Sequence, residues 1–98
     1  MESKDDNGTK WELVGFVRAG KLRQKIVCHL MDRKLTPSEI SRRTGKKPGS
    51  VSKSLAGLRE KNIIKCLNPN AKKGKIFSLT EEGEKVAGEI CPQNESED

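Results

Sequence analysis

The sequence is poor in aromatic side chains. Its 98 residues include one Trp, two Phe and no Tyr. Proteins that bind single-stranded nucleic acids do so largely by stacking bases on several aromatic rings. Three rings, at Trp11, Phe16 and Phe77, are too few for such a surface. We therefore do not expect single-stranded nucleic acid to be the main ligand.

The sequence also lacks long apolar runs and a regular cysteine pattern. No run approaches the length needed to span a membrane, and residues 1–10 are too polar for a secretory signal. The three cysteines, at positions 28, 66 and 91, are odd in number and irregularly spaced, which argues against a secreted disulfide scaffold. We expect a cytoplasmic protein with reduced thiols and no membrane association.

Catalytic and metal-binding patterns are missing as well. The chain has one His, no glycine-rich phosphate loop and no convincing pair of carboxylates. Cys28 and the adjacent His29 would project in different directions from a helix, and no CxxC or HxxxH pair is present. The sequence therefore predicts neither an enzyme nor a metal or cofactor site, and the cysteines are expected to be packing or surface thiols.

Charge is abundant and unevenly distributed. Charged residues make up 35% of the chain and the net charge is +6. Residues 21–61 carry twelve basic and three acidic side chains, residues 62–79 carry four lysines and no acid, and residues 80–98 carry one lysine and seven acids. This distribution is typical of a phosphate-binding surface, although solvated helix faces are the alternative. With only 32% hydrophobic residues, the core is thin, which favours dimerisation.

A single domain is expected at 11–91, between disordered ends at 1–10 and 92–98. It begins with a short apolar helix at 11–17 that packs on the core or on a partner. Three further helices are expected before residue 62. The first of the three, 20–32, repeats apolar residues at helical spacing. The second, 37–44, has a capping box in Thr36 and Glu39, with Gly45 at its C-terminal end. The third, 48–61, buries Val51, Leu55 and Leu58 and turns a face of small and polar residues outward: Gly49, Ser50, Lys53, Ala56 and Gly57.

A β-hairpin and a last helix follow. Two β-prone runs, 63–67 and 75–79, flank a basic turn, and Thr80 caps a helix that ends near Ile90, with Val86, Ala87 and Ile90 facing inward. The predicted fold is mainly α with a β-hairpin.

This order of elements, together with the runs Leu35–Ile40, Asn62–Ile64 and Phe77–Gly83, resembles the small archaeal and bacterial winged helix-turn-helix transcriptional regulators of the MarR/ArsR-like superfamily. The Trp11–Val14 run is similar to the archaeal members. Three positions depart from the pattern. Lys47 stands where Ser or Thr often caps the recognition helix, Ser41 replaces a small apolar residue, and Asn62 replaces a glycine, whose left-handed conformation Asn tolerates.

The resemblance implies that the helix at about 48–61 enters the DNA major groove and that the wing at about 63–79 lies on adjacent backbone or minor groove. Ser50 and Lys53 are best placed for base edges, whereas Ser52 could instead make a local backbone bond. The expected DNA-binding residues are Arg42, Arg43, Lys46, Lys47, Ser50, Ser52, Lys53, Lys72, Lys73 and Lys75.

The expected function is that of a homodimeric, double-stranded DNA-binding transcriptional regulator. Dimer contacts are expected from the N-terminal segment, around Trp11, Val14 and Phe16, and from the last helix, around Val86 and Ile90. The alternatives are a winged-helix adaptor that binds other proteins, and a chromatin-like or RNA-binding protein without sequence preference.

Overall fold

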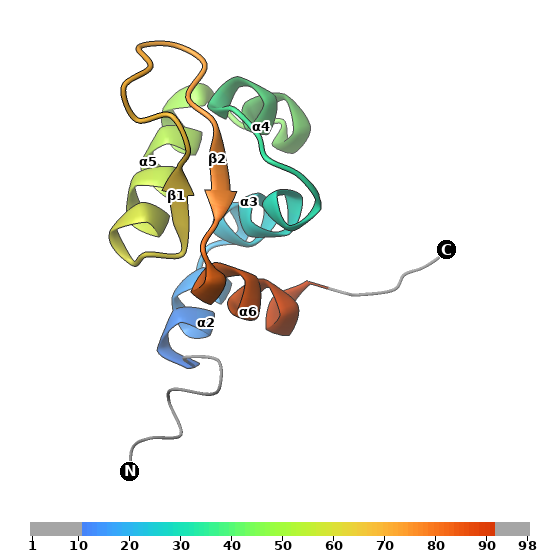
Figure 1. Ribbon diagram of the computed structural model, residues 1–98. Coiled ribbons are helices and arrows are strands. Elements are labelled where there is room, and N and C mark those ends of the chain that lie inside the picture. The colour runs from blue at the N-terminus through green and yellow to red at the C-terminus, as the bar shows by residue number, and fades with distance from the viewer. Residues whose placement is uncertain (1–10, 92–98) are drawn as a thin grey trace.

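The computed structural model describes residues 11–91, which form five helices and a two-stranded antiparallel hairpin (Figure 1). The expected disordered ends at 1–10 and 92–98 lie outside the described residues. The elements are α2 (Trp11–Arg18), α3 (Lys21–Asp32), α4 (Pro37–Thr44), α5 (Pro48–Glu60), β1 (Ile64–Cys66), β2 (Phe77–Leu79) and α6 (Glu81–Ile90). This is the winged helix-turn-helix fold expected from the sequence.

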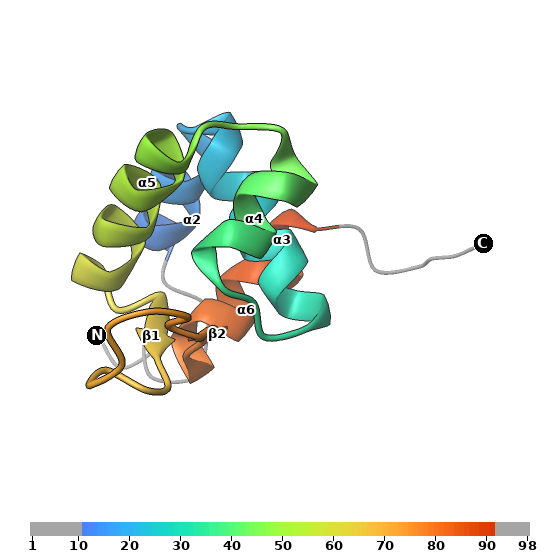
Figure 2. The same cartoon turned by 90° about the horizontal axis from the view of Figure 1, so that it is seen from above.

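Helix α3 is the centre of the molecule and contacts α2, α4, α5, α6 and β2. Its residues Ile26, Val27 and Leu30 are at most 5% exposed. Figure 2 shows α4 in front of α3, with α5 to one side and the hairpin next to α5. Because α5 and strand β2 both pack against α3, the apolar face of α3 fixes how α5 and the hairpin lie relative to each other.

The hairpin and α6 meet at a tight junction. Ile64 pairs with Leu79 and Cys66 with Phe77, and an isolated bridge adds Leu35 to Phe77. Before the hairpin, Asn62 takes the left-handed conformation, with φ of 62°, as the sequence allowed. After it, the Thr80 hydroxyl accepts a hydrogen bond from the Gly83 N–H (2.9 Å) and donates to the Asn62 carbonyl (2.7 Å).

Gly83 explains why this junction is so close. A Cβ atom at Gly83 would lie 1.9 Å from the Ile63 carbonyl oxygen. Only glycine permits this approach, so the start of α6 can sit directly against the strand that leads into the hairpin.

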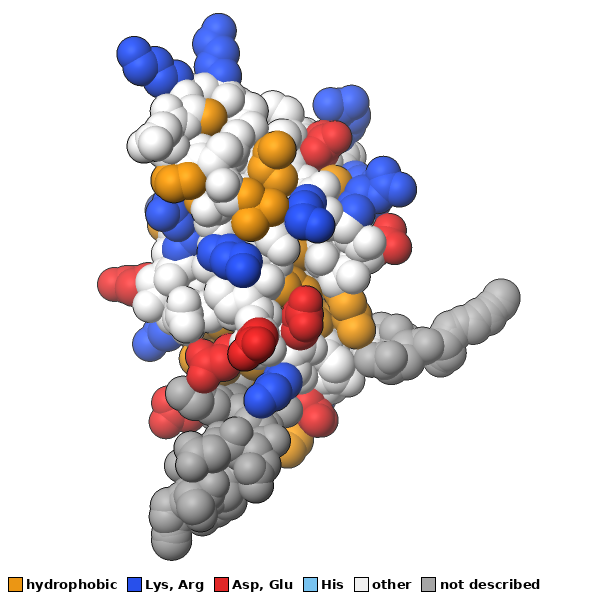
Figure 3. Space-filling model, viewed as in Figure 1, with side chains coloured by type: hydrophobic (Ala, Val, Ile, Leu, Met, Phe, Trp, Pro, Cys, Tyr) orange, Lys and Arg blue, Asp and Glu red, His pale blue; other side chains and the backbone are white. Residues whose placement is uncertain are grey.

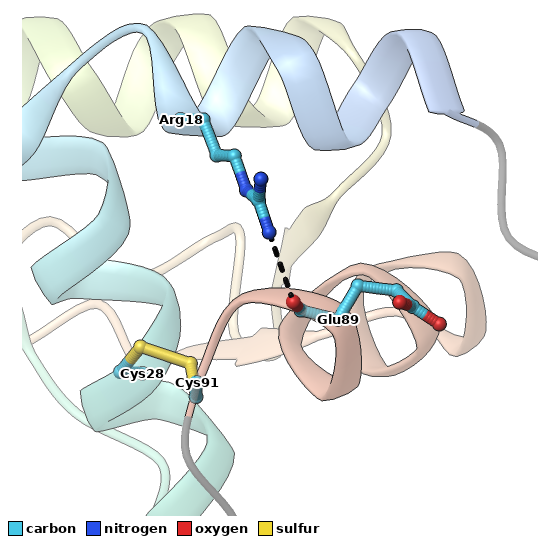
Figure 4. Close-up of a disulfide and its surroundings, with 4 residues drawn as sticks. All are labelled: Arg18, Cys28, Glu89 and Cys91. Carbon is cyan, nitrogen blue, oxygen red and sulfur yellow. Dashed lines mark hydrogen bonds between the residues drawn. A yellow bond between two sulfur atoms is a disulfide. The ribbon is translucent and has the colours of Figure 1, made fainter.

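The cysteine prediction was wrong. Cys28 of α3 and Cys91, which follows α6, form a disulfide across 63 residues of sequence (Figure 4), and Cys66 is the free cysteine of the described chain. The expectation of reduced thiols came from an odd count and irregular spacing. Those features carry no information on which helices the fold brings together. Near the disulfide, the Arg18 guanidinium donates to the Glu89 carbonyl (3.3 Å) and so connects α2 to α6.

Two of the residues expected at a dimer interface belong to the core of the monomer. Val14 is 3% exposed and Val86 is 1% exposed, because α2 and α6 pack against each other and against α3. Trp11, in contrast, is 65% exposed. Phe16 and Ile90 are half-buried. Among the described residues, no helix is long and apolar enough to cross a membrane.

Candidate nucleic-acid interface

Basic side chains gather at one end of the molecule. Figure 3 shows lysine and arginine side chains over the wing and α4, with acidic side chains collected over α6. We call the first region, made of α4, the turn 45–47, α5 and the wing loop 67–76, the basic end. We call α2 and α6 the acidic end. Every residue expected to bind DNA lies in the basic end.

Helix α4 begins with the expected capping box. The Thr36 hydroxyl accepts from the Glu39 N–H (3.2 Å), and Glu39 Oε1 accepts from the Thr36 N–H (2.9 Å). The hydrogen bond from Thr36 lowers the pKa of the Glu39 carboxyl, and the nearby Arg42 and Arg43 add to the effect. Both arginines are exposed and, with Glu39, line a shallow hollow on the outer face of α4.

The turn between α4 and α5 is held by side chains. Gly45 ends α4 in the left-handed conformation, with φ of 71°. The Ser41 hydroxyl donates to the Lys46 carbonyl, and the Thr44 hydroxyl donates to the Ile40 carbonyl (2.8 Å) while accepting from the Lys46 N–H (3.3 Å). Ser41, a departure from the family pattern, therefore stabilises the turn that carries Lys46.

Helix α5 buries Val51, Leu55 and Leu58, as its spacing predicted. Its N-cap, Lys47, makes no side-chain capping bond, which confirms the weak cap. The exposed residues Gly49, Ser50 and Lys53 line a second hollow with Lys47. Ser52 is exposed as well, but it lies on a different side, toward the wing.

The prediction that Gly57 faces outward with Gly49 was wrong. Gly57 is half-buried, and a Cβ atom there would lie 3.4 Å from the Phe16 ring. The Arg23 guanidinium lies 4.0 Å from the centre of this ring and donates to the Phe16 carbonyl (2.6 Å). Gly57 therefore faces the Phe16 ring of α2, and an added Cβ there would make an ordinary van der Waals contact.

The wing loop is organised by Asn68. Its side-chain oxygen accepts from the Ile76 N–H (2.7 Å), and its amide donates to the Gly74 carbonyl (3.3 Å), so one residue at the start of the loop binds two backbone groups near its end. The Cys66 thiol also points to this oxygen (3.6 Å). Lys72 and Lys73 are exposed on the loop, whereas Lys75 is half-buried and faces α5 at the base of the wing.

Arg59 and the groove beside it were not predicted from the sequence. Arg59 is exposed near the end of α5, with its guanidinium 5.8 Å from the centre of the Phe77 ring. The sequence does contain a signal for it, because Ser52, Ala56 and Arg59 follow helical spacing along one side of α5. That side lies next to the apolar stripe and includes Ser52, one of the predicted DNA-binding residues, whereas Ser50 and Lys53 line a different hollow of α5.

No group of three or more His, Cys, Asp or Glu residues within 11–91 could hold a metal ion. Cys28 is engaged in the disulfide. Partial burial, followed by the charge of Arg43, lowers the pKa of His29 and so favours its neutral form.

Residues 20–65, just under half of the chain, match the family described as "Bacterial regulatory protein, arsR family". The match spans α3, α4, α5 and the first residues of the hairpin. No curated protein matches the chain.

Three of the similar solved structures illustrate the likeness. ZitR from Lactococcus lactis, solved as the wild type in complex with DNA, has 28% identity and a TM-score of 0.65 and is matched over 70% of this chain and 48% of its own. The adhesin competence repressor AdcR from Streptococcus pyogenes has 18% identity and a TM-score of 0.67, over 72% of this chain and 54% of its own. HlyU from Vibrio cholerae has 22% identity and a TM-score of 0.69, over 92% of this chain and 94% of its own.

The chain spans about half the length of the ZitR chains it matches. All three of these proteins come from bacteria, so the archaeal part of the expected resemblance finds no support in them. The expected fold is confirmed: the chain is a winged helix-turn-helix protein, and its residues 20–65 match the arsR-family model.

Proposed function

We propose that this protein is a double-stranded DNA-binding transcriptional regulator. The observation that carries the proposal is the basic end, in which a helix-turn-helix and a wing present their lysines and arginines together while the acids of α6 lie elsewhere. A duplex carries one negative charge per ~1.7 Å of its axis, so it matches an extended basic surface of this kind. The likeness to ZitR, which was solved bound to DNA, supports the same function.

The proposed contacts divide into phosphate contacts and base contacts. Arg42, Arg43, Lys46 and Lys47 would lie on the backbone flanking the major groove, and Lys72 and Lys73 on the backbone reached by the wing. Ser50 and Lys53, near the exposed start of α5, would face base edges, and Ser52 would face those nearer the wing. Lys75, at the base of the wing, would contact a phosphate between the helix and the wing.

The acidic end is the proposed dimer surface. Trp11 keeps 65% of its surface exposed on α2, and the half-buried Ile90 adds apolar surface on α6. A homodimer would place two α5 helices in successive major grooves, about one helical turn apart. Sedimentation velocity should then show a dimer that Trp11→Lys converts to a monomer, whereas Lys85→Ala on the same end should leave the dimer intact. A monomeric wild type would contradict this assembly.

We place the protein in the cytoplasm, with the nucleoid, and assign it no catalytic role. The cysteines bear on this location. A disulfide is uncommon in a reducing cytosol, although intracellular proteins of hyperthermophiles are an exception. The Cys28–Cys91 bond is therefore expected to persist there only if burial protects it; Cys91 is 7% exposed, whereas Cys28 is half-buried.

The test begins with selection of bound sequences from a random duplex pool, followed by fluorescence anisotropy on the selected duplex over a range of salt concentrations. A regulator binds the selected duplex at least about a thousandfold more tightly than random duplex. Equal binding to random duplex or structured RNA would favour the protein without sequence preference, and no binding would favour the adaptor.

Lys46→Ala with Lys47→Ala should reduce the salt slope by about 0.9 for each phosphate that these lysines neutralise. Lys85→Ala removes an exposed lysine from α6, outside the basic end, and is the matched control. An unchanged slope in the double variant would remove the turn from the interface.

A further inference from the structure

One groove in the basic end differs in chemistry from its surroundings. It lies between α5 and the base of the wing and is lined by Pro37, Ser52, Leu55, Ala56, Arg59, Lys75 and Phe77. Figure 2 shows α5 and the hairpin as neighbours on this side of the molecule, and α5 contacts β1 directly. Two other hollows of the basic end, described above, are lined by Glu39 with two arginines and by Gly49 and Ser50 with two lysines.

The bottom of the groove is apolar and firmly fixed. Leu55 and Phe77 are 3% and 5% exposed and belong to the core, so neither can move aside. Above them, Ala56 is exposed and Pro37 is half-buried, and each presents carbon atoms to solvent. Pro37 in turn is held by the capping box at the start of α4.

The sides of the groove are basic. The Arg59 guanidinium stands 5.8 Å from the centre of the Phe77 ring, and Lys75 lies opposite on the wing. None of the lining residues is acidic. An apolar partner peptide would bury these two cations without a counter-charge, at a cost in desolvation. A ligand that places phosphates at the sides and a carbon group at the bottom suits both features.

Duplex DNA supplies such a ligand. The 5-methyl group of thymine is the apolar group on the base edges of the major groove, and alanine is among the side chains that contact it. With α5 in the major groove, Ser52 and Ala56 would face base edges while Arg59 and Lys75 reach the flanking phosphates. We propose that this groove receives a thymine methyl group, with Ala56 as the residue that reads it. This rests on the proposed DNA-binding function and assigns it a base preference.

The test removes one methyl group at a time. In the duplex selected from the random pool, each thymine is replaced singly by uracil, which lacks only the 5-methyl group, and affinity is measured by anisotropy at fixed salt. In each half-site, one particular thymine should be sensitive: its single replacement by uracil should weaken binding about fourfold. This is the factor expected for the loss of one buried methyl group. Other thymines should change binding less than twofold.

The variant Ala56→Ser places a hydroxyl group where the methyl would lie. It should bind the thymine and uracil duplexes within about 1.5-fold of each other, because the methyl group then meets a polar atom instead of carbon. Ala19→Ser, an exposed alanine in the link between α2 and α3, is the matched control and should keep the fourfold ratio. Circular dichroism of both variants checks that the fold is unchanged.

The outcomes separate this inference from the proposed function. If the wild type binds the selected duplex but no thymine-to-uracil change weakens it, the groove does not read a methyl group although the protein binds DNA. The same conclusion follows if Ala56→Ser keeps the wild-type ratio. If no duplex is selected or bound, the proposed function itself fails.

Discussion

The two ends of the molecule are stabilised by different kinds of interaction. At the acidic end, α2 and α6 are joined to α3 by buried aliphatic side chains and a disulfide. At the basic end, the turn and the wing depend on hydrogen bonds from exposed or half-buried polar side chains, those of Thr36, Ser41, Thr44 and Asn68. A surface that binds a charged polymer must keep its lysines and arginines exposed to water, so these side chains cannot form a buried core. The turn and the wing that carry them are therefore held in shape by hydrogen bonds of neighbouring polar side chains.

The largest expected effect concerns the disulfide. Its removal in Cys91→Ser frees a loop of 63 residues in the unfolded chain, which should lower the free energy of unfolding by about 4 kcal/mol. Urea titration checks this, with Cys66→Ser, at the free cysteine, as the control expected to change stability by less than about 1 kcal/mol.

Where Cys91→Ser remains folded, its DNA affinity should equal that of the wild type, because the disulfide lies at the acidic end. Equal stability of the two cysteine variants would show that the disulfide contributes little. A loss of DNA affinity by folded Cys91→Ser would show that the two ends are coupled.

The junction between the ends should be nearly as sensitive. Gly83→Ala would place a Cβ atom 1.9 Å from the Ile63 carbonyl oxygen, so α6 must move away from the hairpin, at a cost of about 3 kcal/mol. Gly15→Ala, in α2 with nothing within 4 Å of the added Cβ, should instead gain up to about 1 kcal/mol. Thermal unfolding distinguishes them, and equal melting temperatures would contradict the close approach.

These contrasts also explain what the sequence could predict. Helix α4 was predicted to the residue because its signals, Thr36, Glu39 and Gly45, are local and each has a conformational reason. The disulfide and the close approach at Gly83 depend on which helices meet, which no local pattern encodes, whereas the inward-facing position of Val86 followed from helical spacing and is confirmed. For the candidate interface, the basic turn and wing were identified by charge, whereas the groove at Ala56 required the position of Phe77 from a distant strand.

A smaller effect is expected in the wing. Asn68→Ala removes the hydrogen bonds that close the loop. Because the loop is exposed, the free energy of unfolding should fall by no more than about 1 kcal/mol per bond. Lys72 and Lys73 must then be ordered on binding, so DNA affinity should fall about threefold to tenfold. Ser78→Ala, in β2, whose hydroxyl bonds only the adjacent Leu79 carbonyl, is the control. Unchanged affinity of Asn68→Ala would mean that the wing is not preorganised by this residue.

The smallest effect, and the one that separates the ends by pH, comes from the capping box of α4. The hydrogen bond from Thr36 lowers the pKa of Glu39 in the folded chain below its ordinary value of 4.5. A lowered pKa contributes stability that is present above 4.5 and is lost as the pH falls through the folded value. The stability difference between wild type and Glu39→Ala should therefore be constant near neutral pH and shrink below pH 4.5. Glu39→Gln keeps an acceptor for Thr36 but does not titrate, so urea titrations should show no such dependence in the difference between Glu39→Gln and Glu39→Ala. A difference between wild type and Glu39→Ala that persists unchanged into acid would mean that the negative charge of Glu39 does not contribute to the capping box.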